Sequence, residues 1–441
     1  MMTVSEGVAV MTQTERFKEI PYLVCLKLAG AIVHDKYKGK DAKCLVIDGQ
    51  EYPVSDIDFK IVEVIADEVA KELELPRVLS ARYMMCAHRL ALMKMEKYLP
   101  AKAPVKKIAM LKDTSGSGYW RMVLPAKHMD GNDVSIDVTS AEMKFESLLE
   151  YDTVFVQRLH DWESYYILEK LKKAGRKVVY DMDDDIFSLT PDNPAFHVIG
   201  RDNQMAAREC MKLADVVTTT TDLLGERLKR VCDGEVEPVT MPNAVSMDGW
   251  IPTDLVGSPD EWKRIFWQGS ATHEEDWELC IVALDEIMKS RDDVRMVILG
   301  YLPKSVQALS SMPHWKGRIE YMGFSDTETY FQIVKHLRAE VGLAPLQNTV
   351  FNQAKSSIKW MENALIGMPT VASACSPYAE VIEDNVSGRI VVPGVDSWRE
   401  AIESYLDNKP LRIETVRAAR EEIGEQFNIA KVAEDWRTIL W

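Results

Sequence analysis

Short apolar runs alternate with amphipathic stretches in the first part of the region 104–441, and this alternation predicts strands separated by helices. We expect strands in VKKIAML from Val105, DTVFVQR (152–158), RKVVYDMDDD (176–185) and ADVVTTTT (214–221). Helices are predicted over 162–174, about 203–213 and 223–232. Nearly continuous apolar runs are typical of parallel strands that are covered on both faces.

The same order returns in the second part of this region. RIFWQGSATHEEDW (264–277) is predicted to contain a strand, a Gly loop and the start of a helix with His273 and Asp276. Further strands are expected in VRMVILGY (294–301), RIEYMGF (318–324), AEVGLAPL (339–346) and TVA (370–372). A helix is predicted over 356–366, with Ile358, Met361 and Leu365 as its buried stripe and Gly367 as its stop. The repeated alternation predicts an α/β protein with two doubly wound domains and a ligand cleft between them.

Residues 1–103 carry no Gly-rich motif. Two stretches, 14–36 and 56–98, have helical character, and CLVIDGQEYPV between them resembles a hairpin with Asp48 and Gly49 as its turn. We therefore expect a mainly helical N-terminal extension over 1–103 and a first Rossmann-like domain over 104–258. A second would follow over 259–428, with a terminal helix at 429–441.

The composition is that of a soluble globular protein, with 46% hydrophobic and 28% charged residues. The net charge of −16 disfavours non-specific binding to nucleic acid or to an anionic membrane. Seven cysteines are scattered without a CxxC pair, which predicts reduced thiols and a cytoplasmic location. The N-terminus shows no secretory signal, and the longest apolar run (22–33) is too short to span a bilayer.

Two lysines and a glutamate are spaced to share one face of the predicted helix at 356–366. Lys355, Lys359 and Glu362 follow one another at steps of four and three residues. Like charges at such spacing repel by roughly 0.2–0.5 kcal/mol, and an anion between them would reverse that effect. The helix N-terminus also favours a phosphate. The alternative is that both lysine side chains are solvated and that Lys359 forms an ion pair with Glu362.

The stretch 351–388 contains Lys-Ser-x-Ile-Lys-x-x-Glu, Gly-x-Pro-Thr-Val-Ala-Ser, Tyr-x-Glu-Val-Ile and Gly388, in this order. With these motifs it resembles the donor half of GT-B glycosyltransferases, most closely the large retaining family four. The resemblance implies a GT-B fold whose last helix crosses back to the first domain. It also implies that Glu362 binds the ribose of a nucleotide-diphosphate sugar and that basic groups bind its diphosphate. The donor-binding candidates are Glu362, Lys355, Lys359, Ser356, Gly269, Ser270 and His273.

The loop after the first predicted strand of the first domain, Thr-Ser-Gly-Ser-Gly-Tyr-Trp-Arg, is rich in glycine. Such a loop can bring backbone N–H groups to a phosphate or a sugar, although an ordinary flexible turn has the same composition. In GT-B enzymes this loop faces the cleft between the domains. The resemblance therefore makes Gly116, Gly118 and Arg121 candidates for lining the cleft.

An acidic run, Asp-Met-Asp-Asp-Asp at 181–185, follows a predicted buried strand. Carboxylates this close raise one another's pKa unless cations or helix N-termini lie nearby. A carboxylate here could orient or deprotonate an acceptor hydroxyl, which makes Asp181 and Asp183 the catalytic candidates. YDMDDD suits an Asp-bearing branch of the resembled family.

Three other interpretations of this run remain. A divalent cation could bind the carboxylates, as at the Asp-x-Asp of the GT-A fold; however, GT-A enzymes lack a separate donor domain. Haloacid-dehalogenase-like phosphatases also carry Asp-x-Asp after a strand, but they need Thr or Val where Asp185 stands. The third interpretation is a solvated loop that caps the next helix.

Two departures from the family pattern are visible. Ala354 stands where many members carry a glutamate, eight residues before Glu362, and the loop at 269–273 lacks the usual basic pair. We hypothesise a hexosyl- or pentosyltransferase that needs no metal cofactor and acts by front-face attack. Its acceptor would be a glycan or lipid-linked saccharide, or less readily a protein or a modified DNA base held by Lys102, Lys106, Lys107 and Lys112. The alternative is a catalytically silent binding or assembly subunit.

Overall fold

The structure is a computed structural model that describes residues 44–47, 50–53 and 105–441, apart from 114–115, 130–132, 141–143, 249–251 and 253–255. The chain divides into two compact units, Met1–Pro104 and Val105–Trp441. In the smaller unit, β1 (Cys44–Ile47) pairs with antiparallel β2 (Gln50–Pro53), which confirms the predicted hairpin. The helices predicted at 14–36 and 56–98 lie outside the described residues.

The first sheet of the larger unit consists of parallel strands in the order β4-β3-β5-β6-β7-β8. Its strands are β3 (Lys106–Lys112), β4 (Val134–Ser140), β5 (Thr153–Gln157), β6 (Lys177–Met182), β7 (Val216–Thr219) and β8 (Val239–Thr240). The predicted strands at β3, β5, β6 and β7 are confirmed. The pattern analysis missed β4, because an edge strand carries alternating polar and apolar residues instead of a continuous apolar run.

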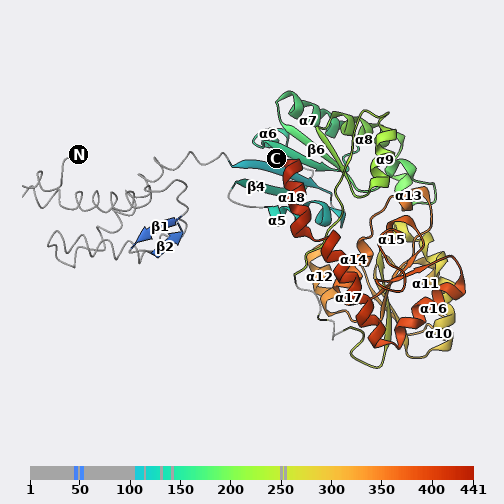
Figure 1. The fold of residues 1–441 in the computed structure, drawn as a ribbon. Helices are drawn as coiled ribbons and strands as arrows, with labels where there is room; N and C mark the ends of the chain where they lie inside the picture. The colour runs from blue at the N-terminus through green and yellow to red at the C-terminus, as the bar shows by residue number, and fades with distance from the viewer. Residues whose placement is uncertain are drawn as a thin grey trace, which may run out of the picture. The chain divides into compact units, whose positions relative to one another are not determined.

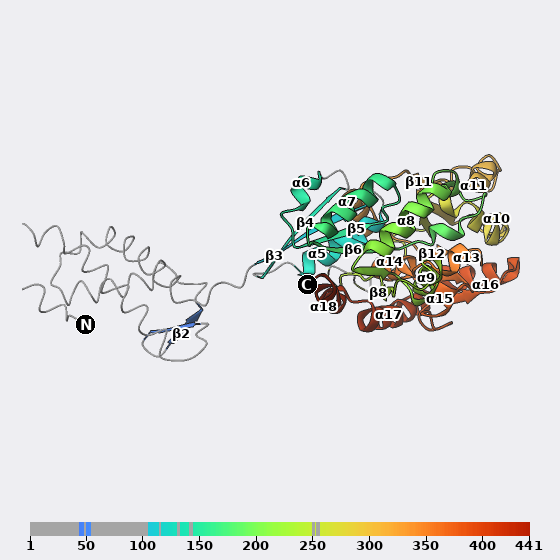
Figure 2. The ribbon, with the colours of Figure 1, turned by 90° about the horizontal axis from the view of Figure 1, so that it is seen from above.

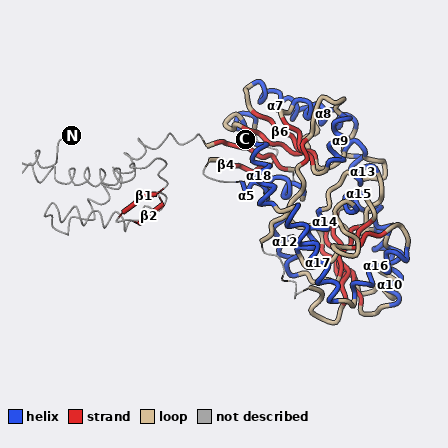
Figure 3. The backbone as a smooth tube through the Cα atoms, in the orientation of Figure 1, coloured by secondary structure: helices blue, strands red, loops and turns tan. Residues whose placement is uncertain are grey.

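Helices cover both faces of this sheet, and we call the part built on it (residues 105–248) the first domain (Figure 3). Its helices are α5 (Leu124–Met129), α6 (Phe145–Leu148), α7 (Trp162–Lys173), α8 (Arg201–Leu213) and α9 (Asp222–Val231). Side chains alternate along β5 as the pleat requires. Val154 and Val156 pack into one apolar cluster with Leu168 of α7, and Phe155 packs into another on the opposite face.

The last helix of the chain, α18 (Ile429–Leu440), lies on the first sheet (Figures 1 and 2). It covers the face opposite α7 and contacts α5. The Trp436 ring lies 5.1 Å from that of Phe155, and Thr153 Oγ1 donates to the Leu440 carbonyl at 2.9 Å. The C-terminal helix is therefore part of the core of the first domain.

The second sheet also consists of parallel strands, in the order β11-β10-β9-β12-β13-β14. Its strands are β9 (Lys263–Gly269), β10 (Val294–Gly300), β11 (Ile319–Met322), β12 (Val341–Ala344), β13 (Thr370–Ser373) and β14 (Arg389–Val391). The strands predicted at β9 to β13 are confirmed. We call the part built on this sheet, residues 256–428, the second domain.

Its helices are α10 (Ile281–Ser290), α11 (Lys304–Leu309), α12 (Thr327–His336), α13 (Val350–Gln353), α14 (Ile358–Leu365), α15 (Ser376–Ala379), α16 (Val395–Leu406) and α17 (Lys409–Gln426). Gly367 ends α14 with φ +80°, so the predicted glycine stop is confirmed. The predicted buried stripe is only partly right. Met361 is buried together with Trp360 and Ala364, whereas Ile358 and Leu365 are partly exposed, since α14 packs on both α17 and the sheet.

Each sheet reverses its strand order once, and ligands of doubly wound folds bind beyond the carboxyl ends of the strands at that point. The reversal lies between β3 and β5 in the first sheet and between β9 and β12 in the second. The first residues after these strands are Asp113, Arg158, Ser270 and Pro345. No helix among the described residues has both the length and the apolar character needed to cross a bilayer.

Candidate functional site

A pocket of about 230 Å³ lies between the two domains. Gly116 and Trp120 line it from the first domain, while Gln268, Gly269, Tyr330 and Glu362 contribute from the second. Its remaining lining residues are Leu299, Gly300, Gly323, Phe324, Ser325 and Phe331. It is therefore a largely apolar pocket with one carboxylate, and it lies at the carboxyl ends of β9 and β10.

Glu362 points from α14 toward this pocket. Its carboxylate accepts hydrogen bonds from Gln268 Nε2 at 2.6 Å and from the Tyr330 hydroxyl at 3.2 Å. Burial raises the pKa of Glu362 to about 7, although nearby Lys359 opposes this shift. The carboxylate thus has a fixed orientation and can accept hydrogen bonds from ligand hydroxyl groups.

Lys359 forms a chain of contacts with His273 and Asp276. Its Nζ lies 2.9 Å from His273 Nε2, and His273 Nδ1 lies 2.6 Å from Asp276 Oδ2. Burial, reinforced by Lys359, lowers the pKa of His273 to about 4, so the ring is neutral at pH 7. The neutral ring must then donate from Nδ1 to Asp276 and accept at Nε2 from Lys359.

The ammonium group of Lys359 therefore has a neutral partner. Among the described residues no carboxylate lies within ion-pair distance of it, and burial together with Lys355 lowers its pKa to about 8. A partly buried cation whose partner is neutral can bind an anion, which would favour its charged form.

Lys355 lies in the turn before α14 and not on the helix, because α14 begins only at Ile358. The prediction that Lys355 and Lys359 share a helix face is therefore wrong. The two lysines nevertheless interact, since Lys355 lowers the pKa of Lys359. Lys355 Nζ lies 3.6 Å from Asp184 Oδ1 of the first domain, and neighbouring Ser356 accepts from Asn243 Nδ2 at 2.8 Å.

The glycine-rich loop of the first domain approaches the pocket through Gly116. At Gly118 a Cβ atom would lie 2.4 Å from the Asp113 carbonyl oxygen, so only glycine fits without a shift of the backbone. A π-helical turn, Tyr119–Val123, follows directly. Tyr119 and Trp120 of this turn pack against Phe331 of α12, with ring centroids 4.9 and 5.8 Å apart.

Arg121, a cleft candidate from the sequence, and Asp181, a catalytic candidate, are completely buried and form an ion pair with each other. The guanidinium donates to both carboxylate oxygens, and Thr218 Oγ1 also donates to Asp181 at 2.7 Å. In this structure neither side chain is exposed to the cleft.

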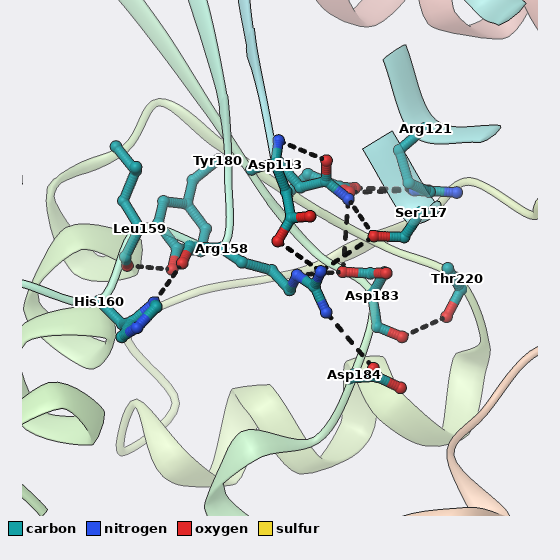
Figure 4. Close-up of polar contacts among 12 residues, drawn as sticks. Asp113, Ser117, Arg121, Arg158, Leu159, His160, Tyr180, Asp183, Asp184 and Thr220 are labelled. Atoms are coloured by element: carbon teal, nitrogen blue, oxygen red, sulfur yellow. Dashed lines mark hydrogen bonds and ion pairs between the residues drawn. The ribbon is translucent and has the colours of Figure 1, made fainter. Parts of the chain in front are cut away.

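Arg158 lies at the switch point of the first sheet and contacts three carboxylates (Figure 4). Its guanidinium forms ion pairs with Asp113, Asp183 and Asp184. Burial raises the pKa of Asp183 to about 6 despite the nearby Arg158. Burial also favours a higher pKa of Asp184, but the positive charges of Lys355 and Arg158 outweigh burial and lower the pKa of Asp184. Asp183 can therefore gain or lose a proton near neutral pH.

Sequence reasoning did not select Arg158, Gln268 or Tyr330. Arg158 could have been found, because it is the polar residue that ends a buried strand at the switch point. Its φ of +50° is uncommon for a residue other than glycine and marks a locally strained backbone. Within the described residues, no group of three or more His, Cys, Asp or Glu side chains is arranged to hold a metal ion.

The second domain matches a known protein family. Residues 256–422 match the family described as glycosyl transferases group 1. The match agrees with the resemblance that the motifs of this part of the chain imply. A comparison of the sequence with curated proteins finds no match.

Several solved structures share the fold over both domains. HepE of Anabaena in complex with UDP has 12% identical residues and a TM-score of 0.55, covering 76% of this chain and 99% of its own. Sucrose-phosphate synthase from Thermosynechococcus elongatus has 14% identity and a TM-score of 0.56, covering 76% and 98%. A glycosyltransferase from Rickettsia africae has 14% identity and a TM-score of 0.52, covering 76% and 98%. The predicted GT-B fold is confirmed.

Proposed function

We propose that the protein is a glycosyltransferase that moves a sugar from a nucleotide-diphosphate sugar to a hydroxyl acceptor, with retention of configuration. One observation carries the proposal. In a domain that matches glycosyl transferases group 1, α14 presents an oriented carboxylate, Glu362, to the interdomain pocket and holds a partly buried ammonium group, Lys359, one turn before it. A nucleoside diphosphate offers hydroxyl groups to the first and negative charge to the second.

The donor roles follow from this geometry. Glu362 accepts from the ribose hydroxyls, and Lys359 and Lys355 bind the diphosphate together with backbone N–H groups near Gly269 and Ser270. His273 acts through Lys359, because its Nε2 fixes the ammonium group. In front-face transfer the leaving diphosphate itself helps to deprotonate the acceptor, so stabilising its charge is the main contribution of the protein.

The acceptor roles belong to the first domain. Asp183 can orient the acceptor hydroxyl, because its pKa of about 6 keeps it mostly ionised at pH 7 and its ion pair with Arg158 holds it beside the switch point. We assign Asp181 a positioning role instead of a catalytic one, because its oxygens accept from Arg121 and Thr218. The Gly116–Gly118 loop and Trp120 would border the acceptor side of the pocket. The acceptor class stays as proposed from the sequence: a glycan or lipid-linked saccharide first.

UDP is the first nucleotide to test, since the Anabaena HepE structures that share the fold are complexes with UDP or UDP-glucose. Thermal unfolding should be followed with UDP, ADP, GDP and TDP, for the wild type and Glu362→Ala. A ligand at 100 times its dissociation constant adds about 2.7 kcal/mol of stability. Stabilisation of the wild type by one nucleotide, and its loss in the variant, supports the proposal. If none of the four stabilises the wild type, the proposal fails.

A silent GT-B subunit is the second candidate, and two observations favour it. Ala354 is completely buried and offers no side-chain donor or acceptor to a sugar, and no basic residue lies between Gly269 and His273. Slow release of nucleoside diphosphate from the donor in the absence of acceptor would show that the protein is an enzyme. Binding without any release would decide for the subunit.

A further inference from the structure

Residues 350–356, which we call the docked segment, belong to the second domain but pack against the first. Phe351 and Ala354 are 7% and 0% exposed and belong to the apolar cluster of the first domain. Thr221 Oγ1 donates to the Ala354 carbonyl at 3.0 Å, and Asn243 Nδ2 donates to Ser356 Oγ at 2.8 Å. Both apolar and polar contacts thus hold this segment on the first domain.

Arg227 of α9 makes the most extensive of these polar contacts. Its Nη1 donates to the Val350 carbonyl and its Nη2 to Gln353 Oε1 at 3.0 Å, so one guanidinium binds both ends of α13. Nη1 also lies 3.4 Å from Asp185 Oδ2. Asp185 is 1% exposed and accepts from Ser188 Oγ at 2.6 Å, which fixes this carboxylate in turn.

Lys355 follows Gln353 by two residues, so the position of α13 determines where its ammonium group lies. The Nζ atom is 4.5 Å from the centre of the Phe351 ring and 3.6 Å from Asp184. The last two carboxylates of the acidic run therefore act on one lysine. Asp184 contacts it directly, and Asp185 acts through Arg227 and the docked segment.

We propose that Arg227 is a positioning residue for the diphosphate site: from the first domain it fixes α13 and thereby holds Lys355 ready for the donor. This inference rests on the proposed function, in which Lys355 binds the diphosphate. A side chain that is already ordered spares the ligand an ordering cost of about 0.5–1.5 kcal/mol. Loss of the Arg227 contacts should therefore weaken diphosphate binding by roughly two- to tenfold.

The test compares UDP with UMP by isothermal titration calorimetry, because the two ligands differ only in the second phosphate. The variants are Arg227→Ala, Arg227→Lys and, as matched control, Arg230→Ala, which removes an exposed arginine from the same helix. We expect Arg227→Ala to weaken UDP binding by roughly two- to tenfold and to leave UMP binding within about twofold. Arg227→Lys should not rescue it, since lysine retains the charge but cannot bond both ends of α13. Arg230→Ala should match the wild type.

The possible failures are distinguishable. If the wild type binds none of UDP, ADP, GDP and TDP, the proposed function and this inference both fail. If wild type prefers ADP, GDP or TDP, that diphosphate and its monophosphate replace the UDP and UMP pair. If wild type prefers the diphosphate but Arg227→Ala weakens both ligands equally, or neither, the inference alone is overturned. Should Arg227→Ala not fold, Gln353→Leu removes one of the same contacts and should reduce the preference for diphosphate in the same direction.

Discussion

The guanidinium of Arg121 and the carboxylate of Asp181 form a two-point ion pair closed to solvent, with Nε–Oδ2 at 3.0 Å and Nη2–Oδ1 at 2.7 Å. Arg121 also donates to Asn243 Oδ1 at 3.2 Å, and Asn243 donates in turn to Ser356 beside Lys355. The pair thus connects the glycine-rich loop, strand β6 and the segment that carries a proposed donor lysine.

The first prediction concerns the stability of this ion pair. Arg121→Leu leaves the Asp181 carboxylate buried without a cation, so we expect a loss of about 3–5 kcal/mol of unfolding free energy. The double variant Arg121→Leu, Asp181→Leu removes both charges and should recover most of that loss. Urea unfolding measures the unfolding free energy of the single and of the double variant. A loss below about 1 kcal/mol for Arg121→Leu would contradict the structural role.

The second prediction concerns pH. Donor binding needs Glu362 ionised and Lys359 protonated, and their pKa values are about 7 and about 8. Affinity should rise as pH increases through 7, since ionised Glu362 accepts ribose hydroxyls more strongly. It should fall as pH increases through 8, since Lys359 then loses its charge. His273 does not contribute, because its pKa of about 4 keeps it neutral throughout.

UDP-glucose suits this measurement, because neither of its phosphates has a second ionisation near neutral pH. Calorimetric titrations between pH 5.5 and 9.5 should therefore give a bell-shaped affinity profile. Glu362→Gln should remove the acid limb and Lys359→Met the basic limb. A flat wild-type profile would show that these groups do not bind the donor.

The third prediction concerns the charge of Lys359. Lys359→Met retains the length of the side chain but removes the ammonium group, so UDP affinity at pH 7 should fall by about tenfold or more, as for a charged hydrogen bond worth about 1.5–3 kcal/mol. The control is Lys316→Met, which removes an exposed lysine of the same domain. Equal affinity of the two variants for UDP would argue that Lys359 is a structural residue.

The fourth prediction separates acceptor from donor chemistry at Asp183. Asp183→Asn should lower donor hydrolysis by about tenfold or more, because the attacking hydroxyl then loses a hydrogen bond to a charged carboxylate. Its affinity for UDP should stay unchanged. Asp292→Asn, at an exposed position of the second domain, serves as control. Retained hydrolysis in Asp183→Asn would move the acceptor role to another residue.

The sequence pattern predicted the strands that are buried on both faces and the glycine that ends α14. It missed β4, whose edge position gives it a weaker apolar signal. It also put Lys355 on one face with Lys359 and Glu362 at the start of a helix over 356–366, whereas α14 begins only at Ile358.

The partners of each site residue could not be predicted from local pattern. Arg121 and Asp181 are 60 residues apart in the chain, and Gln268 and Glu362 are 94 apart, so only the strand order brings them together. Burial, which sets the pKa values of Glu362, Lys359 and His273, likewise depends on how the two domains pack. Residue types and spacing identified the candidate site residues, whereas the contacts among these residues depend on the fold.

The most direct test of the proposed function is release of nucleoside diphosphate from nucleotide sugars without acceptor. Purified wild type and Glu362→Ala should be incubated with UDP-, ADP-, GDP- and TDP-glucose, and the diphosphate measured over time. We predict slow release from one of these donors by the wild type and at least about a tenfold lower rate for the variant at limiting donor. No release from any donor, or equal release by both proteins, would contradict a glycosyltransferase that binds its donor through Glu362.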